Sequence, residues 1–279
     1  MKAFLESEIE SLPAERCRFH IIPAPLEKTV SYGAGTARGP EAILEASYQL
    51  EAFDGISCPC EAGIFTHTIA KTLEAIEDSV AQVLNLNGLP ILLGGEHTVT
   101  LGALRALKAR EESFGIVQFD AHADLRDEYE GDPFSHACVM RRALELDIPI
   151  FQIGVRALSK EEADLRTRIG IGFLDGYCIG QEGLPSSILP KNFPKKIYLS
   201  IDLDALDPSI MPSTGTPEPG GLNWFQFFKA IELVLKNRTV VGFDVVELAP
   251  IKGQHAPDFL AARLIYNLMG KIERSTQKI

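Results

Sequence analysis

The chain alternates short apolar runs with segments of helical periodicity along nearly its whole length. Apolar, β-rich runs predict strands at Arg18–Ile22, Leu89–Leu93, Phe114–Phe119, Ile150–Gly154, Lys196–Ile201 and Thr239–Val246. Strands that alternate with helices are typical of βαβ units, whose strands run parallel and whose helices lie on the two faces of the sheet. The pattern therefore predicts an α/β fold with a mostly parallel central sheet that is covered on both faces.

Local start signals support the helical segments. Pro40 stands in the first turn of a predicted helix over Glu41–Leu50, where its missing N–H costs nothing. Apolar residues three and four positions apart predict a second helix over Ile69–Leu86. Capping-box patterns predict that two further helices begin after Ser159 and after Asn223.

Composition narrows the class of protein. No linker or internal repeat divides the 279 residues, so we expect a single domain over residues 1–279. The chain has 27 Lys and Arg against 38 Asp and Glu, a net charge of −11. This balance argues against nucleic acid or an anionic membrane surface as a partner, because both are bound through Lys and Arg. It is compatible with a small cationic substrate.

The cysteines and the apolar runs indicate the compartment. Five cysteines at irregular spacing do not form a disulfide framework, which favours a reducing environment. We expect the Cys58/Cys60 pair to lie in an ordinary surface loop rather than in a redox or metal site. The apolar runs are too short to cross a bilayer, and residues 1–16 lack the apolar stretch of a secretory signal. These features predict a cytoplasmic protein.

Acidic and histidine residues follow three of the predicted strands. They are Asp120, His122 and Asp124 after Phe114–Phe119, Asp202 and Asp204 after Lys196–Ile201, and His97 after Leu89–Leu93. In open α/β sheets, ligands bind outside the carboxyl ends of the strands, so we expect all six side chains at one edge. If the backbone stays extended, Asp120, His122 and Asp124 also share one face. His20, His67 and His255 lack this context and are expected to be ordinary core or surface residues.

The donor set predicts a metal centre. A single aspartate after a strand is usually only a turn or a helix cap, so the interpretation rests on the three strand ends together. Four carboxylates and two imidazoles are too many for an ordinary zinc site, and they suit two adjacent divalent ions. Without a cation these carboxylates would repel one another, and their pKa values would rise. The oxygen-rich set favours Mn²⁺, with Zn²⁺, Ni²⁺ and Fe²⁺ as alternatives.

These segments resemble the metal-binding motifs of the ureohydrolases, the arginase/agmatinase superfamily. The matching segments are Gly-Gly-Glu-His at 94–97, Asp-Ala-His-Ala-Asp at 120–124, the Ser-Ile-Asp-Leu-Asp run from 200, Thr-Gly-Thr-Pro-Glu-Pro-Gly-Gly-Leu at 214–222 and Asp-Val-Val-Glu-Leu-Ala-Pro at 244–250. Glu96 departs from the aspartate of many members. The resemblance implies a three-layer α/β/α sandwich with an arginase/deacetylase-like sheet, and a homotrimer or homohexamer.

The resemblance also implies two Mn²⁺ ions in each chain and the residues that serve them. The implied ligands are His97 and Asp124 for one ion, His122 and Asp204 for the other, and Asp120 and Asp202 for both. The implied catalytic residues are Asp124, His136 and Glu247. Glu247 would grip a guanidinium group, and His136 would shuttle a proton or position the substrate.

The implied reaction is hydrolysis of a guanidino group to urea and an amine. The run Leu125–Tyr129 lacks the asparagine that arginases typically carry there, which favours agmatine, hydrolysed to putrescine in polyamine biosynthesis. Arg126 leaves guanidinobutyrate open, because an arginine can meet a carboxylate. Arginase, formiminoglutamase and a non-catalytic metal-binding assembly protein are the remaining alternatives.

Overall fold

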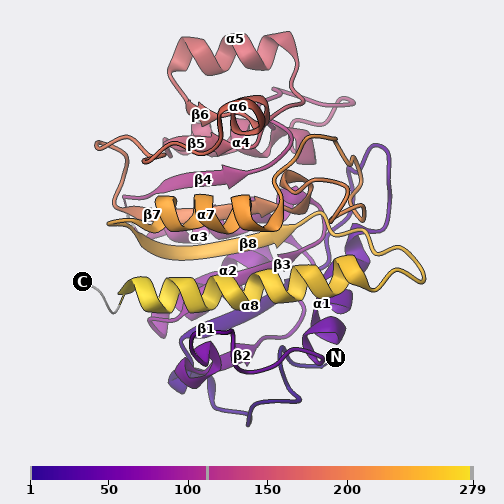
Figure 1. Ribbon diagram of the computed structural model, residues 1–279, viewed down its shortest axis with the longest axis vertical. Helices are drawn as coiled ribbons and strands as arrows, with labels where there is room; N and C mark the ends of the chain where they lie inside the picture. Colours follow the sequence, from indigo (N-terminus) through magenta and orange to yellow (C-terminus); the bar gives the residue numbers. More distant parts are fainter. Residues whose placement is uncertain (1, 111–112, 277–279) are drawn as a thin grey trace.

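Eight parallel strands form one sheet in the computed structural model, which describes residues 2–110 and 113–276 (Figure 1). The spatial order is β2-β1-β3-β8-β7-β4-β5-β6. The strands are β1 (Phe19–Ala24), β2 (Ile64–Thr66), β3 (Leu89–Gly94), β4 (Gly115–Phe119), β5 (Ile150–Ile153), β6 (Gly172–Leu174), β7 (Lys196–Asp202) and β8 (Thr239–Val246). The predicted parallel α/β sheet is confirmed.

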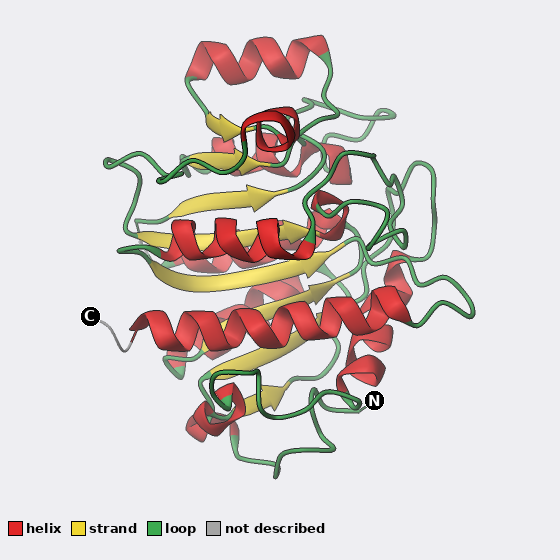
Figure 2. Cartoon of the chain, in the orientation of Figure 1, coloured by secondary structure: helices red, strands yellow, loops and turns green. Residues whose placement is uncertain are grey.

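Helices cover both faces of this sheet and complete the three-layer sandwich (Figures 1 and 2). α7 and α8 lie in front of the sheet in Figure 1, and α2 and α3 lie behind it. The helices are α1 (Gly39–Ser47), α2 (Leu73–Asn85), α3 (Thr100–Ala109), α4 (Val139–Glu145), α5 (Lys160–Ile169), α6 (Gly176–Glu182), α7 (Trp224–Leu235) and α8 (Ala256–Thr276). No helix in the described ranges is long and apolar enough to span a membrane.

Successive strand residues pack into two different hydrophobic cores. In β3, Ile91 and Leu93 lie in the core shared with α1, α7 and α8, whereas Leu92 lies in the core shared with α2 and α3. In β7, Leu199 and Tyr198 divide between the two cores in the same way. This alternation explains the continuous apolar runs of the sequence, since a strand covered on both faces needs apolar residues at every position.

The predicted elements differ from the observed ones mainly at their ends. Both capping boxes are confirmed, at Ser159 before α5 and at Asn223 before α7. α2 begins at Leu73 rather than at Ile69, because Thr72 Oγ1 accepts a hydrogen bond from the backbone N–H three residues later. The sequence prediction did not include the three-residue strands β2 and β6 at the sheet edges, nor the 21-residue helix α8.

The five cysteines are all free, as expected. Cys58 precedes the short 3-10 helix η3 (Pro59–Ala62), and Cys60 lies within it. Cys60 is half-buried and packs against the core, so this segment is more closely attached to the protein than the expected surface loop.

Four strands at the centre of the sheet determine where the candidate functional residues lie. β3, β8, β7 and β4 are neighbours and run parallel, so their carboxyl ends meet at the same edge. β8 is last in the sequence but lies between β3 and β7. It therefore brings the residue after its end, Glu247, between the segments that carry His97 and Asp202.

Two of the histidines that were expected to be ordinary form a pair away from this edge. His20 in β1 is fully buried, and its Nδ1 lies 3.0 Å from Nε2 of His67. Its Nε2 lies 3.1 Å from the carbonyl oxygen of Cys17. Burial and the neighbouring His20 lower the pKa of His67 from the ordinary value of 6.5 to about 4. The folded protein therefore favours neutral His67.

This pair predicts a loss of stability in mild acid. Between pH 6.5 and 4 the unfolded chain binds a proton that folded His67 does not, so the free energy of unfolding falls as the pH falls. Relative to wild type, His67→Gln should lose less stability between pH 7 and pH 5, by about 2 kcal/mol at most, because solvent screens the partly exposed ring. Urea unfolding at the two pH values measures this difference. His255→Gln, at an exposed position, is the control, and an equal loss in wild type and His67→Gln would contradict the assignment.

Candidate metal centre

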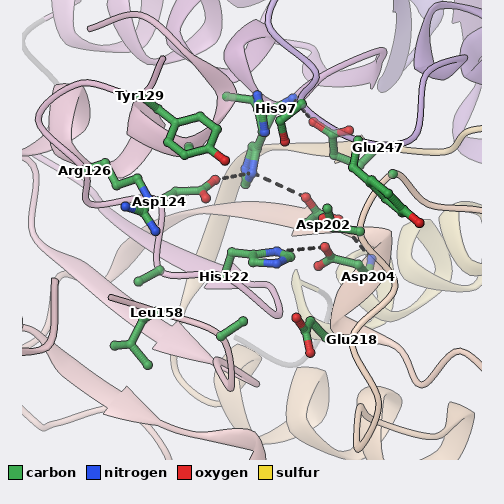
Figure 3. Close-up of a pocket in the computed structure, with 18 of the residues that line it drawn as sticks. His97, His122, Asp124, Arg126, Tyr129, Leu158, Asp202, Asp204, Glu218 and Glu247 are labelled. Atoms are coloured by element: carbon green, nitrogen blue, oxygen red, sulfur yellow. Dashed lines mark hydrogen bonds and ion pairs between the residues drawn. The ribbon is translucent and has the colours of Figure 1, made fainter. Parts of the chain in front are cut away.

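The site lies at the carboxyl edge of the four central strands. Asp120 directly follows β4, Asp202 is the last residue of β7, and Glu247 directly follows β8. His97 opens the short 3-10 helix η4 (His97–Val99), three residues beyond the end of β3. Figure 3 shows the side chains of His97, Asp202 and Glu247 around one pocket, with His122 and Asp204 beside them.

Two groups of side chains have the spacing of metal ligands. The first contains His97, Asp120 and Asp202, and the second contains Asp120, His122 and Asp204. Asp120 belongs to both groups, as expected for a shared ligand, whereas Asp202 belongs only to the first. Asp124 joins the first group through an Oδ2 that lies 2.9 Å from His97 Nδ1. The structure thus brings together all six residues that the sequence singled out.

Backbone amides hold these carboxylates in place. Asp120 Oδ1 accepts a hydrogen bond from His122 N at 2.6 Å, Asp202 Oδ1 from Asp204 N at 2.9 Å, and Asp204 Oδ1 from Ala121 N at 3.0 Å. The second oxygen of Asp202 and of Asp204 faces a histidine of the site. Because the first oxygens are fixed by the chain itself, the geometry of the site is set largely by the backbone.

His97 presents its Nδ1 nitrogen to three carboxylates. Its Nε2 lies 2.8 Å from Ser200 Oγ, and the Ser200 hydroxyl donates to Asp244 Oδ1 at 3.0 Å. The serine therefore accepts the Nε2–H, so Nδ1 is the ring nitrogen that is left to face a cation. Burial disfavours the charged ring, but the carboxylates of Asp120 and Asp124 raise the pKa of His97 well above 6.5, so without a cation Nδ1 carries a proton. Buried Nδ1 has no hydrogen-bond partner among the described residues and lies 2.9–3.6 Å from oxygens of Asp124, Asp120 and Asp202.

A buried imidazole nitrogen and three carboxylate oxygens around one point call for a cation, either a proton or a metal ion. A metal ion fits this donor set, because imidazole nitrogen and carboxylate oxygen are both ligands of divalent transition metals. Ser200 and Asp244 complete the arrangement from behind, as partners that orient a ligating histidine commonly do. Asp244 is held in turn by Thr100 Oγ1, at 2.8 Å from Oδ2.

Without a bound cation, protons must neutralise part of this charge. Burial and the charge of Asp120 raise the pKa of Asp124 to about 6, and burial and the charges of Asp204 and Asp120 raise the pKa of Asp202 well above its usual range. Burial alone would lower the pKa of His122, but hydrogen bonds with Asp120 and Asp204 raise it to about 12. Bound metal would replace these protons, so metal binding should release protons.

Two site residues adopt a backbone conformation that side chains other than glycine rarely take. Asp124 has φ +53° and Glu247 has φ +65°. The carbonyl of Asp124 accepts hydrogen bonds from Met140 N and Arg141 N, which fixes the turned chain. Such conformations cost free energy and persist only where the surroundings enforce them. The extended backbone that a shared face of Asp120, His122 and Asp124 would require does not continue to Asp124, which reaches the site by a left-handed turn.

A cavity of about 410 Å³ opens onto the cluster. It is lined from the loops after β4 and β7 and from residues 30–33 after β1. At its mouth the backbones of Gly33 and Gly215 are in direct contact. A Cβ on Gly33 would lie 2.7 Å from the Gly215 carbonyl oxygen, and one on Gly215 would lie 3.0 Å from the Gly33 carbonyl oxygen.

The other predicted functional residues also line this cavity. His136 lies on its wall at the start of η5 (His136–Cys138). Glu247 is buried, and its Oε1 accepts a hydrogen bond from His97 N at 2.6 Å. Burial raises the pKa of Glu247 to about 8, so a neighbouring cation is needed to keep it ionised at neutral pH. Its Oε2 remains for a ligand in the cavity.

Arg126, by contrast, already has two interaction partners within the protein. Its Nε lies 3.8 Å from Glu162 Oε2, and its guanidinium lies over the Tyr129 ring at 5.1 Å. Glu162 also caps α5 and accepts a hydrogen bond from Leu125 N. The positive charge of Arg126 is therefore partly balanced by the protein, which weakens the case for a substrate carboxylate beside it.

Sequence reasoning missed Arg156 and Glu218. Arg156 Nη2 donates to the carbonyl oxygens of Asp204 and Glu218 at 2.7 Å each, which fastens the loop after β7 to the metal cluster. The Glu218 side chain is half-buried, lines the cavity and lies below Asp204 in Figure 3. Its carboxylate has no ion-pair partner in the described part of the chain. Arg156 lies two residues after a predicted strand and Glu218 lies in the segment 214–222, but nothing in the sequence assigns a role to either side chain.

Both the sequence and the fold of this chain match those of known proteins. The Arginase family model matches residues 17–270. The chain is 39% identical to an N(1)-aminopropylagmatine ureohydrolase of Synechocystis sp., over 99% of this chain and 96% of that protein. It is 31% identical to an agmatinase of Pyrococcus horikoshii, over 96% and 97%. The crystal structure of the agmatine ureohydrolase of Thermoplasma volcanium superposes with a TM-score of 0.85 at 28% identity, covering 100% and 96%.

Removing the Ser200 hydroxyl should weaken metal binding without removing a ligand. In Ser200→Ala, His97 Nε2–H loses its acceptor, and we expect the affinity for Mn²⁺ to fall about 10- to 100-fold. Calorimetric titration of the metal-free protein measures the change. Ser187→Ala, at an exposed loop position, is the matched control. Unchanged affinity in Ser200→Ala would show that this serine does not orient the ligand.

Proposed function

We propose that this chain, which belongs to the arginase family, hydrolyses the guanidino group of a small cationic substrate to urea and an amine. The observation that carries the proposal is the cavity in which two imidazoles, four aspartates and Glu247 meet at the ends of β3, β8, β7 and β4. The donor set, with His97 Nδ1 facing three carboxylates, suits a divalent metal centre, and the family match gives the reaction class.

We propose two Mn²⁺ ions in each chain as the resident cofactor. His97, Asp120, Asp124 and Asp202 would hold one, and His122, Asp204 and Asp120 would hold the other, with Asp202 as a further shared ligand. When bound, such ions supply Lewis-acid activation of water near neutral pH. The carboxylates outnumber the imidazoles, which supports Mn²⁺ over softer ions.

The remaining groups bind and orient the substrate and move protons. A guanidinium carbon is a poor electrophile because its charge is delocalised, so positioning against water matters. Glu247 Oε2 would accept hydrogen bonds from the planar cation, since Oε1 is already held by His97 N. The departing amine needs a proton, and Asp124, on the cluster and on the cavity wall, is placed to supply it. His136 would exchange that proton with solvent.

For the substrate we propose agmatine, with its N(1)-aminopropyl derivative as the second candidate. Both have an alkylamine cation and lack a carboxylate, which suits a cavity that offers unpaired Glu218 and an Arg126 partly balanced by Glu162. The second candidate is favoured by the names of the Synechocystis sp. relative and of a Thermus thermophilus relative, each an N(1)-aminopropylagmatine ureohydrolase. Assembly as a homotrimer or homohexamer is part of the same proposal.

A substrate panel after Mn²⁺ loading tests the reaction. Urea should be released from agmatine or N(1)-aminopropylagmatine far faster than from arginine or guanidinobutyrate, and formiminoglutamate should yield no formamide. His122→Ala should lose both activity and bound metal, because it removes a cluster ligand. His255→Ala, at an exposed position, should retain both. Two bound ions with no hydrolysis of any guanidino compound would favour a non-catalytic metal-binding protein.

Glu218 provides a test of the substrate's second charge. Glu218→Gln removes the negative charge and keeps the shape, so we expect KM for agmatine to rise about tenfold, the loss of one charge-assisted hydrogen bond, with kcat little changed. Glu182→Gln, at an exposed position in α6, is the control. Steady-state urea release gives both constants. An unchanged KM would place the second cation elsewhere in the cavity.

A further inference from the structure

Glu96 stands directly before His97, but its carboxylate is directed to a neighbouring loop. The side chain is buried, with 1% of its surface exposed. Its Oε2 accepts hydrogen bonds from Lys28 N at 2.6 Å and from Thr29 N at 2.7 Å. Its Oε1 accepts one from Thr29 Oγ1 at 3.2 Å. The acid therefore fastens the loop after β1 to the end of β3.

Thr29 also contacts His136. The His136 backbone N–H donates to Thr29 Oγ1 at 2.9 Å, and the same oxygen lies 3.2 Å from His136 Nδ1. The Ser135 hydroxyl lies near the same ring nitrogen, at 3.4 Å. The Tyr129 ring meets the imidazole edge-on, with the ring centroids 6.1 Å apart. One buried carboxylate is thus connected through one hydroxyl to a histidine on the cavity wall.

The single hydrogen of the Thr29 hydroxyl bears on which ring nitrogen of His136 is protonated. The Thr29 hydroxyl has a single hydrogen, and the contact with the Glu96 carboxylate takes it, since a charged acceptor makes the stronger bond. Thr29 Oγ1 can then only accept from the imidazole, which favours the hydrogen on Nδ1. The Ser135 hydroxyl, which could donate to a bare Nδ1, lies farther away, at 3.4 Å against 3.2 Å for Thr29 Oγ1. This leaves Nε2 of His136 as the ring nitrogen that is available to accept a proton in the cavity.

We propose that Glu96 acts through Thr29 as a positioning pair that fixes the Nδ1–H tautomer of His136. The inference rests on the proposed function, in which His136 exchanges a proton with solvent. Neither Glu96 nor Thr29 touches the reacting atoms. Their effect is to keep one tautomer and one ring orientation ready, which saves the cost of rearranging the imidazole in each turnover.

The test compares two substitutions at Thr29. Thr29→Val removes the hydroxyl but leaves the backbone N–H groups of residues 28 and 29 bonded to Glu96, whereas Thr29→Ser retains a hydroxyl. We expect Thr29→Val to lower kcat about 10- to 100-fold, below the full effect of losing an acid–base group, with KM and bound metal unchanged. Thr29→Ser should keep kcat within about threefold of wild type, and Thr68→Val, at an exposed position, should match wild type.

Histidine-selective ¹⁵N NMR of the metal-free protein gives a readout independent of activity. The ring nitrogens of His136, assigned with His136→Gln, should report an Nδ1–H tautomer in wild type and its loss in Thr29→Val. An Nε2–H tautomer in wild type, or equal losses of kcat in Thr29→Ser and Thr29→Val, would overturn the inference. Absence of urea release from wild-type protein would instead contradict the proposed function and leave the tautomer result standing as its own measurement of Glu96 and Thr29.

Discussion

Mutual repulsion among buried carboxylates at the edge of β3, β8, β7 and β4 is the constraint on which the rest of the site depends. Backbone N–H groups donate hydrogen bonds to one oxygen of Asp120, Asp202 and Asp204, but these bonds do not cancel the negative charge of the four aspartates. The remaining charge must be balanced by protons or by metal ions. A ligand that binds only the folded chain stabilises it, so occupancy of this edge and the stability of the central sheet are linked.

Much of the fold follows from the sequence because its strands are covered on both faces. Such strands need apolar residues at every position, so β3, β4 and β7 stand out in the sequence. The edge strands β2 and β6 are three residues long and carry too few residues to show a pattern. α8 was not predicted, although Pro257 in its first turn is the same kind of start signal as Pro40 and its buried face closes one of the two cores.

The metal cluster was predictable because its residues follow strands directly, and parallel strands bring their ends together. The residues that support it were not predictable in this way. Ser200 and Asp244 lie inside strands, where a polar residue gives no sign of its partner across the sheet. Arg156 and Glu218 meet through backbone carbonyls, which no side-chain pattern encodes. Asp124 departs from the extended spacing because the chain turns there with positive φ.

The contact between Gly33 and Gly215 has a consequence for how this pocket can change over evolutionary time. Where two main chains touch, neither position accepts a larger residue without moving a whole loop, so this part of the entrance has a fixed width. Variation in ligand size must therefore arise at the side chains around it, such as Tyr32 and Leu158, which line the cavity. Homologues can therefore change their substrate specificity by substituting these cavity-lining side chains while the contact between Gly33 and Gly215 is kept.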